Sequence, residues 1–184
     1  MEIIAGDALK VEFPEFDKVV SNLPYSISSE ITFKLLRYKF KLGILMYQYE
    51  FAVRMVSPPD CKDYSRLTVD TYYFADASIL MKVPKDVFQP APEVDSAVVK
   101  LIPRPAPFEV RDEAFFLEFV TAVFGQRRKK LRNSILNTNH VLKIPEIKEV
   151  VNQLPEDLMN KRAENLTPEE LALVANMIFD LKSR

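Results

Sequence analysis

The first residues with an evident chemical use are Asn22-Leu23-Pro24-Tyr25, which follow the apolar run Lys18–Ser21. At the end of a strand they would place an amide, a backbone carbonyl and an aromatic face on one rim. The Asn22 amide oxygen and the Leu23 carbonyl can accept both hydrogens of an exocyclic amine while Tyr25 stacks on its ring. Pro24 fixes its own φ and offers no competing N–H. The alternative is an ordinary turn after a buried strand, since Asn and Pro are frequent turn residues.

A strand end that carries these groups would suit a reaction at the nitrogen of an aromatic amine. The lone pair of an arylamine is conjugated into its ring, which makes the nitrogen a poor nucleophile. Hydrogen bonds that draw the nitrogen toward tetrahedral geometry free the lone pair for attack on a methyl group. No general base is then required, because the amine proton becomes acidic only after the methyl group has been transferred.

A second aromatic candidate is Phe88, which opens the proline-rich loop Phe88–Ser96 between two expected strands. The prolines make this loop stiff and extended, so Phe88 is held in a fixed place. It could form the second face of a base sandwich opposite Tyr25, and such stacking is worth about 1–3 kcal/mol per base. The alternative is a core aromatic beneath a proline-rich loop.

The strongest charge cluster has five cations in six positions, at Arg127, Arg128, Lys129, Lys130 and Arg132. We expect a helix over residues 127–137, on which these charges would surround the axis and could not all be paired internally. A phosphate-contacting surface is favoured over an ordinary solvated helix face. Because the formal net charge of the chain is −1, any affinity for nucleic acid must come from this local patch.

Composition disfavours several other kinds of site. Cys61 is the only cysteine and His140 the only histidine, so an internal disulfide, a Cys/His metal site and a histidine-dependent triad are not expected. The three glycines are too far apart for a glycine-rich nucleotide loop. A lone cysteine, no apolar run of membrane length and no signal-peptide pattern predict a cytoplasmic protein without membrane contact.

The hydrophobic pattern predicts the scaffold that positions these residues. Strands are expected at residues 2–5, 18–21, 42–47, 78–83 and 97–102, and helices at 29–38, 50–56 and 64–75. Their alternation predicts a mostly parallel α/β sheet. Prolines between residues 103 and 107 mark a linker, after which helices are expected at 112–124, 127–137 and 145–153. Thr167-Pro168-Glu169-Glu170 opens a last helix with a capping box. We therefore expect an α/β domain over residues 1–104 and a helical domain over 105–184.

Together and in this order, these segments resemble the rRNA adenine N6,N6-dimethyltransferases. The matching segments are Gly6–Leu9, Asn22–Ser28, Gln48–Phe51, Tyr64–Leu67, Phe88–Val99, Phe124–Lys129 and Arg162–Thr167. The resemblance implies a Rossmann-like class I methyltransferase domain followed by a helical rRNA-binding domain. The implied activity uses S-adenosylmethionine to dimethylate two adjacent adenosines of small-subunit rRNA during ribosome biogenesis.

The resemblance also implies roles for individual residues. The catalytic set is Asn22, Leu23, Pro24, Tyr25 and Phe88, which surround the target adenine. Asp7 resembles the contact to the cofactor adenine, and Asn22 also faces the cofactor. The residues of the Arg127–Arg132 segment resemble the surface that docks rRNA, and the implied partner is the pre-ribosomal small subunit.

The chain departs from the family pattern in one respect. Members begin with a strand, a Glu-x-Gly-x-Gly-x-Gly loop and a second strand ending in an acidic residue, and no such loop occurs here. We therefore expect impaired cofactor binding and an incomplete sheet with residues 18–21 at its edge. Residues 2–5 would pair there or with another copy of the chain, so self-association is expected. The alternative function is a non-catalytic rRNA-binding assembly factor, and methylation of free or DNA adenine is a weaker third.

Overall fold

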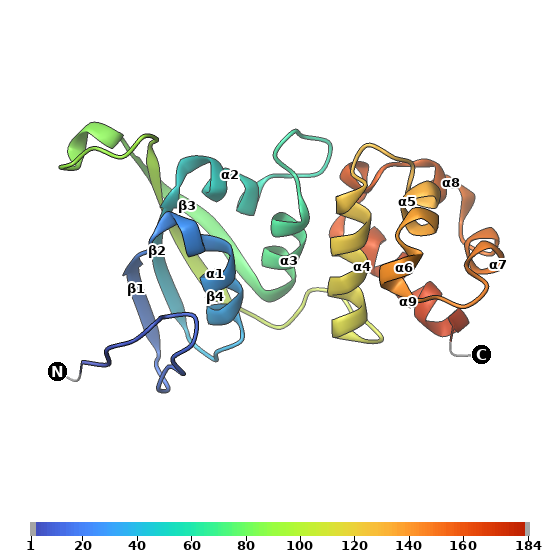
Figure 1. The fold of residues 1–184 in the computed structure, drawn as a ribbon, viewed down its shortest axis with the longest axis horizontal. Coiled ribbons are helices and arrows are strands. Elements are labelled where there is room, and N and C mark those ends of the chain that lie inside the picture. The colour runs from blue at the N-terminus through green and yellow to red at the C-terminus, as the bar shows by residue number, and fades with distance from the viewer. Residues whose placement is uncertain (1–2, 183–184) are drawn as a thin grey trace. The chain divides into compact units, whose positions relative to one another are not determined.

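The computed structural model describes residues 3–182, which fold as two compact units (Figure 1). The first unit contains the chain up to Val56 together with Phe74–Pro105. The second contains Ser57–Tyr73 and the chain from Ala106 onward. The segment Ser57–Tyr73 therefore folds with the helices, whereas its position in the sequence lies within the expected first domain. The chain passes from one unit to the other three times.

The first unit is built on a four-stranded sheet in the order β1-β2-β4-β3 (Figure 1). β1 (Lys18–Asn22) runs parallel to β2 (Leu42–Gln48). β4 (Ser96–Pro103) is antiparallel to both β2 and β3 (Ala75–Val83). The expected mostly parallel sheet is thus wrong, since one of the three pairings among the described strands is parallel. A proline-rich loop without an α-helix joins β3 to β4, so the chain returns as an antiparallel hairpin.

β1 lies at an edge of the sheet, as expected. The strand expected at residues 2–5 is not found: Glu2 lies outside the described residues, and residues 3–5 form no strand. Ile3 and Ile4 are exposed, so the apolar run that predicted a strand has no sheet surface to bury against. Val20 of β1 is 81% exposed. The edge is therefore open and apolar, and self-association through it stays a prediction.

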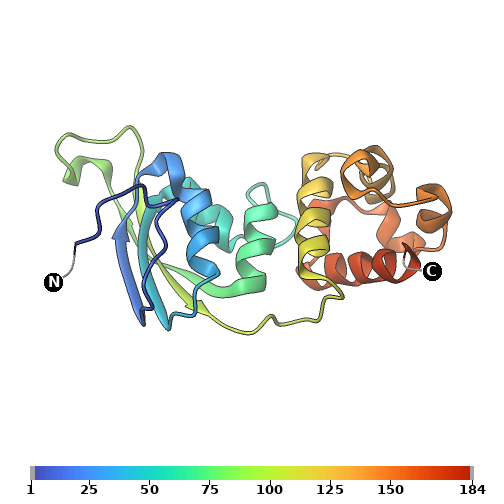
Figure 2. The same cartoon turned by 60° about the horizontal axis from the view of Figure 1, so that its bottom comes forward.

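Two helices cover one face of the sheet, as Figure 2 shows. They are α1 (Ser28–Leu36) and α2 (Tyr49–Val56), close to their expected positions. Alternate residues of the central strands, such as Leu45 and Tyr47 of β2, are fully buried beneath them, following the two-residue period of a strand. The Tyr47 hydroxyl is 2.7 Å from Thr32 Oγ1 of α1, which fastens that helix to the sheet.

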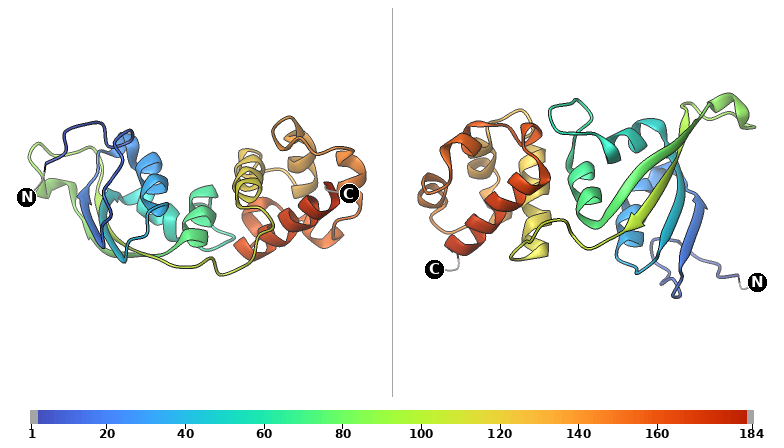
Figure 3. Two further views of the ribbon diagram at one scale, coloured as in Figure 1. Left: turned by 90° about the horizontal axis from the view of Figure 1, so that it is seen from below. Right: turned by 180° about the vertical axis from the view of Figure 1, so that it is seen from behind.

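The second unit is helical throughout. Its helices are α3 (Arg66–Phe74), which runs one residue into the first unit, α4 (Glu113–Gly125), α5 (Leu131–Asn137), α6 (Asn139–Leu142), α7 (Ile147–Asn152), α8 (Glu156–Asn160) and α9 (Pro168–Lys182) (Figure 3). The capping box expected at the last helix is confirmed. Thr167 Oγ1 accepts from Glu170 N at 3.2 Å, and Glu170 Oε2 accepts from Thr167 N at 2.9 Å. Two of the orphan donors at the start of α9 are thereby satisfied.

The helix expected over residues 127–137 is shorter than predicted. α4 ends at Gly125, residues 126–128 form a turn, and Lys130 forms an isolated antiparallel bridge with Arg162 before α5 begins at Leu131. Like charges three and four residues apart repel one another on a helix, and Gly125 has a low intrinsic helix propensity. Four of the five predicted phosphate-binding cations therefore lie on a connection between helices, which we call the basic loop (Arg127–Lys130), and Arg132 alone of the five lies on α5.

α3 is fastened to the rest of the second unit by polar contacts at both ends. Arg66 Nη1 donates to Thr121 Oγ1 of α4 at 3.3 Å, and the Tyr73 hydroxyl donates to Glu113 of α4 at 3.2 Å. Asp70 lies between them, one helical turn after Arg66, and its side chain is 7% exposed. Its Oδ2 is 3.5 Å from Arg66 Nε, while its Oδ1 is buried without a hydrogen-bond partner. Burial raises the pKa of Asp70 to about 7, and the Arg66 guanidinium offsets part of that effect.

Candidate functional site

A cavity of about 240 Å³ opens at the end of β1 in the first unit. Its lining consists of Asn22, Leu23, Pro24, Tyr25, Met46, Phe88, Pro90 and Pro92. All five residues of the predicted catalytic set are therefore brought together, although two distant segments supply them. Met46, Pro90 and Pro92 were not among the predicted site residues. Met46 lies directly opposite Asn22 on β2, a pairing that no sequence pattern indicated.

The local sequence explains how the strand ends at this cavity. Asn22 is the last residue of β1, and Pro24 has an extended backbone with φ −60° and ψ 128°. Because Pro24 has no N–H, it cannot continue the ladder, and the chain turns into a 3-10 helix, η1 (Tyr25–Ile27). Leu23 is buried, whereas Asn22 is exposed and its side chain makes no hydrogen bond within the described chain. The Asn22 amide is thus available to a ligand.

The two aromatic residues of the cavity are held in different ways. The Tyr25 hydroxyl is 2.5 Å from Ser96 Oγ at the start of β4. Phe88 follows a short 3-10 helix, η2 (Lys85–Val87), and has an extended backbone with φ −104° and ψ 151°. Within the described residues neither ring stacks on another aromatic ring. Both side chains line the same cavity, as the predicted sandwich requires.

Other residues considered from the sequence lie elsewhere. The backbone N–H of Tyr49 donates to the Asp95 carbonyl at 2.9 Å, and its ring lies 4.7 Å from Lys82 Nζ, so it supports the base of the loop and does not line the cavity. Tyr64 belongs to the second unit, where its hydroxyl donates to the Leu166 carbonyl at 2.8 Å. Both residues thus have roles in packing.

Asp7, the predicted contact to a cofactor adenine, makes local contacts. Its carboxylate accepts from Leu9 N at 2.9 Å and lies 3.8 Å from Lys10 Nζ. This is the self-capping turn that aspartate commonly forms. Asp7 lines neither the cavity at Asn22 nor the second cavity described next, so its role toward a cofactor stays a prediction.

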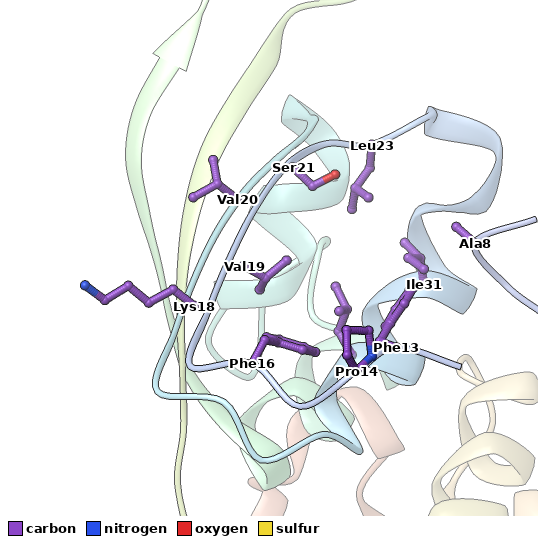
Figure 4. A pocket seen from close by; sticks show the side chains of 11 residues that line it. Ala8, Phe13, Pro14, Phe16, Lys18, Val19, Val20, Ser21, Leu23 and Ile31 are labelled. Carbon is purple, nitrogen blue, oxygen red and sulfur yellow. The ribbon is translucent and has the colours of Figure 1, made fainter. Parts of the chain in front are cut away.

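A second cavity, of about 340 Å³, lies between β1, α1 and residues 8–16 (Figure 4). Apolar side chains such as Phe13, Val19 and Ile31 line most of it, and Leu23 is shared with the first cavity. S-adenosylmethionine carries a ribose diol, an ammonium group and a carboxylate, which need polar partners. Lys18 and Ser21 are the only polar side chains in this lining, and no acidic residue lines either cavity. The linings of these two cavities therefore do not fit the whole of such a cofactor.

The basic loop in the second unit is less uniformly available than its sequence suggests. Arg127 Nε donates to Glu164 at 2.7 Å, and its Nη2 donates to the Cys61 carbonyl at 3.0 Å. Lys130 donates to Asn160 at 3.0 Å, and Arg132 donates to Asn152 at 2.9 Å. The exposed side chains of Arg128 and Lys129 make no such contact within the described chain. These two are the cations best able to meet a phosphate.

Two further kinds of site were sought among the described residues. No group of three or more acidic, histidine or cysteine side chains there is close enough to hold a metal ion. None of the described helices has the length and hydrophobicity that crossing a bilayer would require.

Comparison with known proteins gives consistent matches over almost the whole chain. The model of the family described as "Ribosomal RNA adenine dimethylase" matches residues 1–178. A "probable ribosomal RNA small subunit methyltransferase A" from Methanosarcina acetivorans is 89% identical over the whole chain, and the counterpart from Methanococcoides burtonii is 62% identical over 183 residues. In each case the match covers 68% of the relative's length.

Solved structures agree with these matches. The crystal structure of a dimethyladenosine transferase from Plasmodium falciparum superposes with a TM-score of 0.83 at 32% identity, over 99% of this chain and 73% of that one. The 23S rRNA methyltransferase ErmE has a TM-score of 0.63 at 24% identity, over 97% of this chain and 72% of that one, and supports the fold alone. The expected fold class, an incomplete Rossmann-like methyltransferase sheet with a helical unit, is confirmed. The chain belongs to the ribosomal RNA adenine dimethylase family, whose members are rRNA adenine methyltransferases.

Proposed function

We propose that the cavity at Asn22 holds an adenine of small-subunit rRNA for methylation of its N6 amine. In this proposal the complete activity is N6,N6-dimethylation of two adjacent adenosines during assembly of the small subunit. The observation that carries the proposal is the lining of one cavity by Asn22, Leu23, Tyr25 and Phe88. An amide oxygen, a backbone carbonyl and two aromatic side chains are the groups that an extruded adenine needs.

Each group has a distinct part in holding the base. The Asn22 amide oxygen and the Leu23 carbonyl accept the two hydrogens of the amine, which favours the tetrahedral nitrogen that can attack a methyl group. Tyr25 and Phe88 replace the stacking partners that the base loses when it leaves its helix, and each such contact is worth about 1–3 kcal/mol. Guanine would present a carbonyl oxygen to two acceptors, so the same pair of groups disfavours it.

The methyl group comes from S-adenosylmethionine in this proposal, as family membership implies. Because the described residues supply few of the polar contacts that this cofactor needs, we assign to this chain the binding of the base. In this proposal the exposed cations Arg128 and Lys129 also contribute to RNA binding. They contact rRNA phosphates irrespective of base sequence.

The proposal is tested with a short single-stranded RNA in which one adenosine is replaced by fluorescent 8-vinyladenosine, which keeps the 6-amino group. Binding to the chain should quench the base by stacking, and Tyr25→Ala or Phe88→Ala should abolish the quenching even when the RNA is saturated with protein. Tyr72→Ala is the matched control, because Tyr72 is a partly exposed aromatic residue of the second unit. Equal quenching in the parent chain and both cavity variants would refute the base sandwich.

A non-catalytic rRNA-binding assembly factor is the second candidate, favoured by the poor fit of the described residues to the cofactor. Asn22→Ala separates the two candidates when methyl transfer to rRNA is measured in a version of the chain to which the family's glycine-rich cofactor segment has been added. A methyltransferase should then lose kcat with little change in RNA affinity, because Asn22 acts mainly in the transition state. An assembly factor should show no methyl transfer even with that segment present, and no effect of Asn22→Ala on binding to the subunit.

A further inference from the structure

Two consecutive residues, Asp95 and Ser96, are linked by hydrogen bonds to the two aromatic residues of the cavity, Ser96 directly to Tyr25 and Asp95 through Lys85 to Phe88, although neither of them lines it. Asp95 ends the loop that carries Phe88, and Ser96 begins β4. One dipeptide is therefore connected to Tyr25 through one residue and to Phe88 through the other. Nothing in the proposed binding of the base uses this connection.

Ser96 is a rigid anchor for Tyr25. It is fully buried, and in the sheet register it lies opposite Gln48 of β2 and Val83 of β3. A residue paired on both sides cannot shift without disturbing both neighbouring strands. The 2.5 Å contact between Ser96 Oγ and the Tyr25 hydroxyl therefore fixes the far end of the ring. Since η1 fixes the backbone at the other end, the tilt of the Tyr25 ring is determined at two points.

Asp95 restrains Phe88 indirectly, through hydrogen bonds that involve the backbone of the loop. Its carboxylate accepts from the Lys85 N–H at 3.0 Å and lies 2.8 Å from Lys82 Nζ. Lys85 begins η2, and its carbonyl accepts from the Phe88 N–H at 3.3 Å. The hydrogen bonds from Lys82 and from the Lys85 backbone keep the pKa of Asp95 below its ordinary value. The acceptor is thus ionised at neutral pH, and η2 is held against the start of β4.

We propose that Asp95 and Ser96 are positioning residues that set the spacing between the Tyr25 and Phe88 rings. This inference rests on the proposed function, because the spacing matters only if a base is stacked between the rings. Aromatic rings attract one another at centroid separations of about 4.5–7 Å, so a base held on both faces needs both rings in range at once. Loosening either ring then weakens the sandwich although both aromatic side chains remain.

The Ser96 contact is tested by removing each of its two partners separately and together. The variants are Ser96→Ala, Tyr25→Phe and the double variant, and the probe is the single-stranded RNA with 8-vinyladenosine. Each single variant should lower the equilibrium constant for stacking about fivefold, the equivalent of one hydrogen bond of about 1 kcal/mol. The double variant should be no worse than either, because the same bond is lost. The comparison is made with the RNA saturated by protein, so that a difference in affinity does not enter it.

Tyr47→Phe is the matched control for the loss of a buried hydroxyl pair. It removes the 2.7 Å contact between Tyr47 and Thr32 in the same unit, and neither residue lines the cavity. Its stacked population should equal that of the parent chain. If Tyr47→Phe and Ser96→Ala lower stacking equally, the effect is a general loss of stability and the positioning role of Ser96 is overturned.

The Asp95 contact is tested by a rescue. Asp95→Ala removes the acceptor for the Lys85 N–H and should lower stacking at least as much as Ser96→Ala. Asp95→Asn keeps an acceptor oxygen there and should restore most of it. Asp86→Ala, an exposed aspartate of the same loop with no side-chain contact in the described chain, is the control. Equal losses in Asp95→Ala and Asp95→Asn would assign the effect to charge and overturn the role of the hydrogen bond.

A measurement without RNA separates this inference from the proposed function. Carbon-13 relaxation of the Tyr25 ring in the free chain should report greater ring mobility in Ser96→Ala than in the parent chain. Unchanged mobility overturns the positioning role of Ser96 whether or not the RNA binds. A parent chain that leaves 8-vinyladenosine unstacked counts against the proposed function, and the ring mobility then still decides whether Ser96 positions Tyr25.

Discussion

Asp70 should make the stability of the protein fall as pH rises. Its carboxyl, on α3, is buried with one oxygen unpartnered, and burial raises its pKa from an ordinary 3.8 to about 7. Between these two values the folded chain holds a proton on Asp70 that the unfolded chain has lost. Unfolding then releases a proton, so the free energy of unfolding decreases with rising pH across that window and levels off above it.

The size of the effect follows from the displacement of the pKa. Each pKa unit corresponds to about 1.4 kcal/mol, so a rise from 3.8 to about 7 costs the folded chain about 4 kcal/mol at pH 8 relative to acid pH. Water reaching the carboxylate reduces the cost, so this is an upper limit. A change of even half that size is large beside a total stability of about 5–15 kcal/mol.

Asp70→Asn removes the titration while keeping nearly the same shape. Urea unfolding followed by circular dichroism from pH 4 to pH 8 should show a falling stability for the parent chain and a flatter profile for the variant. Asp63→Asn, in the same segment, removes an aspartate without a side-chain contact in the described chain and should keep the parent's slope. Parallel profiles for the parent chain and Asp70→Asn would refute the reasoning, whatever their offset.

Three further outcomes are expected. Replacing Arg128 and Lys129 together by alanine should weaken binding to any RNA. It should also flatten the plot of the logarithm of the binding constant against the logarithm of salt concentration, by about 0.7–0.9 per lost phosphate contact. Lys148→Ala, which removes another exposed cation, should leave that slope unchanged. Arg127→Ala should instead lower the free energy of unfolding by about 1–3 kcal/mol, because Glu164 loses a charged partner. Arg128→Ala should leave the free energy of unfolding unchanged, and thermal unfolding of the two variants measures the difference. Calorimetric titration with S-adenosylmethionine should show no micromolar binding by this chain, since no acidic residue lines either cavity. A micromolar Kd would contradict the expectation of impaired cofactor binding.

Local chemistry made part of the site predictable. The turn after β1 follows from Pro24, the start of α9 from the Thr167 capping box, and the fixed place of Phe88 from its prolines. Each is decided by residues within a few positions of one another. The pairing of Phe88 with Tyr25 was a hypothesis from two aromatic residues that the resemblance to a family then supported, since nothing in the local pattern of Asn22 points to Phe88.

Long-range pairing could not be predicted from the sequence pattern. Alternating apolar residues define the faces of β4, but they do not place it between β2 and β3. Arg127 carries the same charge as Arg128, yet its partner Glu164 lies 37 positions away and comes close only after the chain has folded. The bond between Ser96 and Tyr25 was missed for the same reason. The sequence around a serine at the start of a strand does not indicate which residue its hydroxyl group will contact.

The return of Ser57–Tyr73 to the second unit bears on how the protein is made. Synthesis proceeds from the amino terminus, so this segment leaves the ribosome before any of the helices α4 to α9 exist. β3 and β4 follow it, and the sheet can close while Tyr64, Leu67 and Val69, all buried in the finished fold, still lack the helices of their own unit. Exposed apolar segments of this kind are where nascent chains aggregate. A nascent chain that has reached Pro105 thus has every strand of the described sheet. Some 80 more residues must still be synthesised before Ser57–Tyr73 has all the helices of its own unit to pack against.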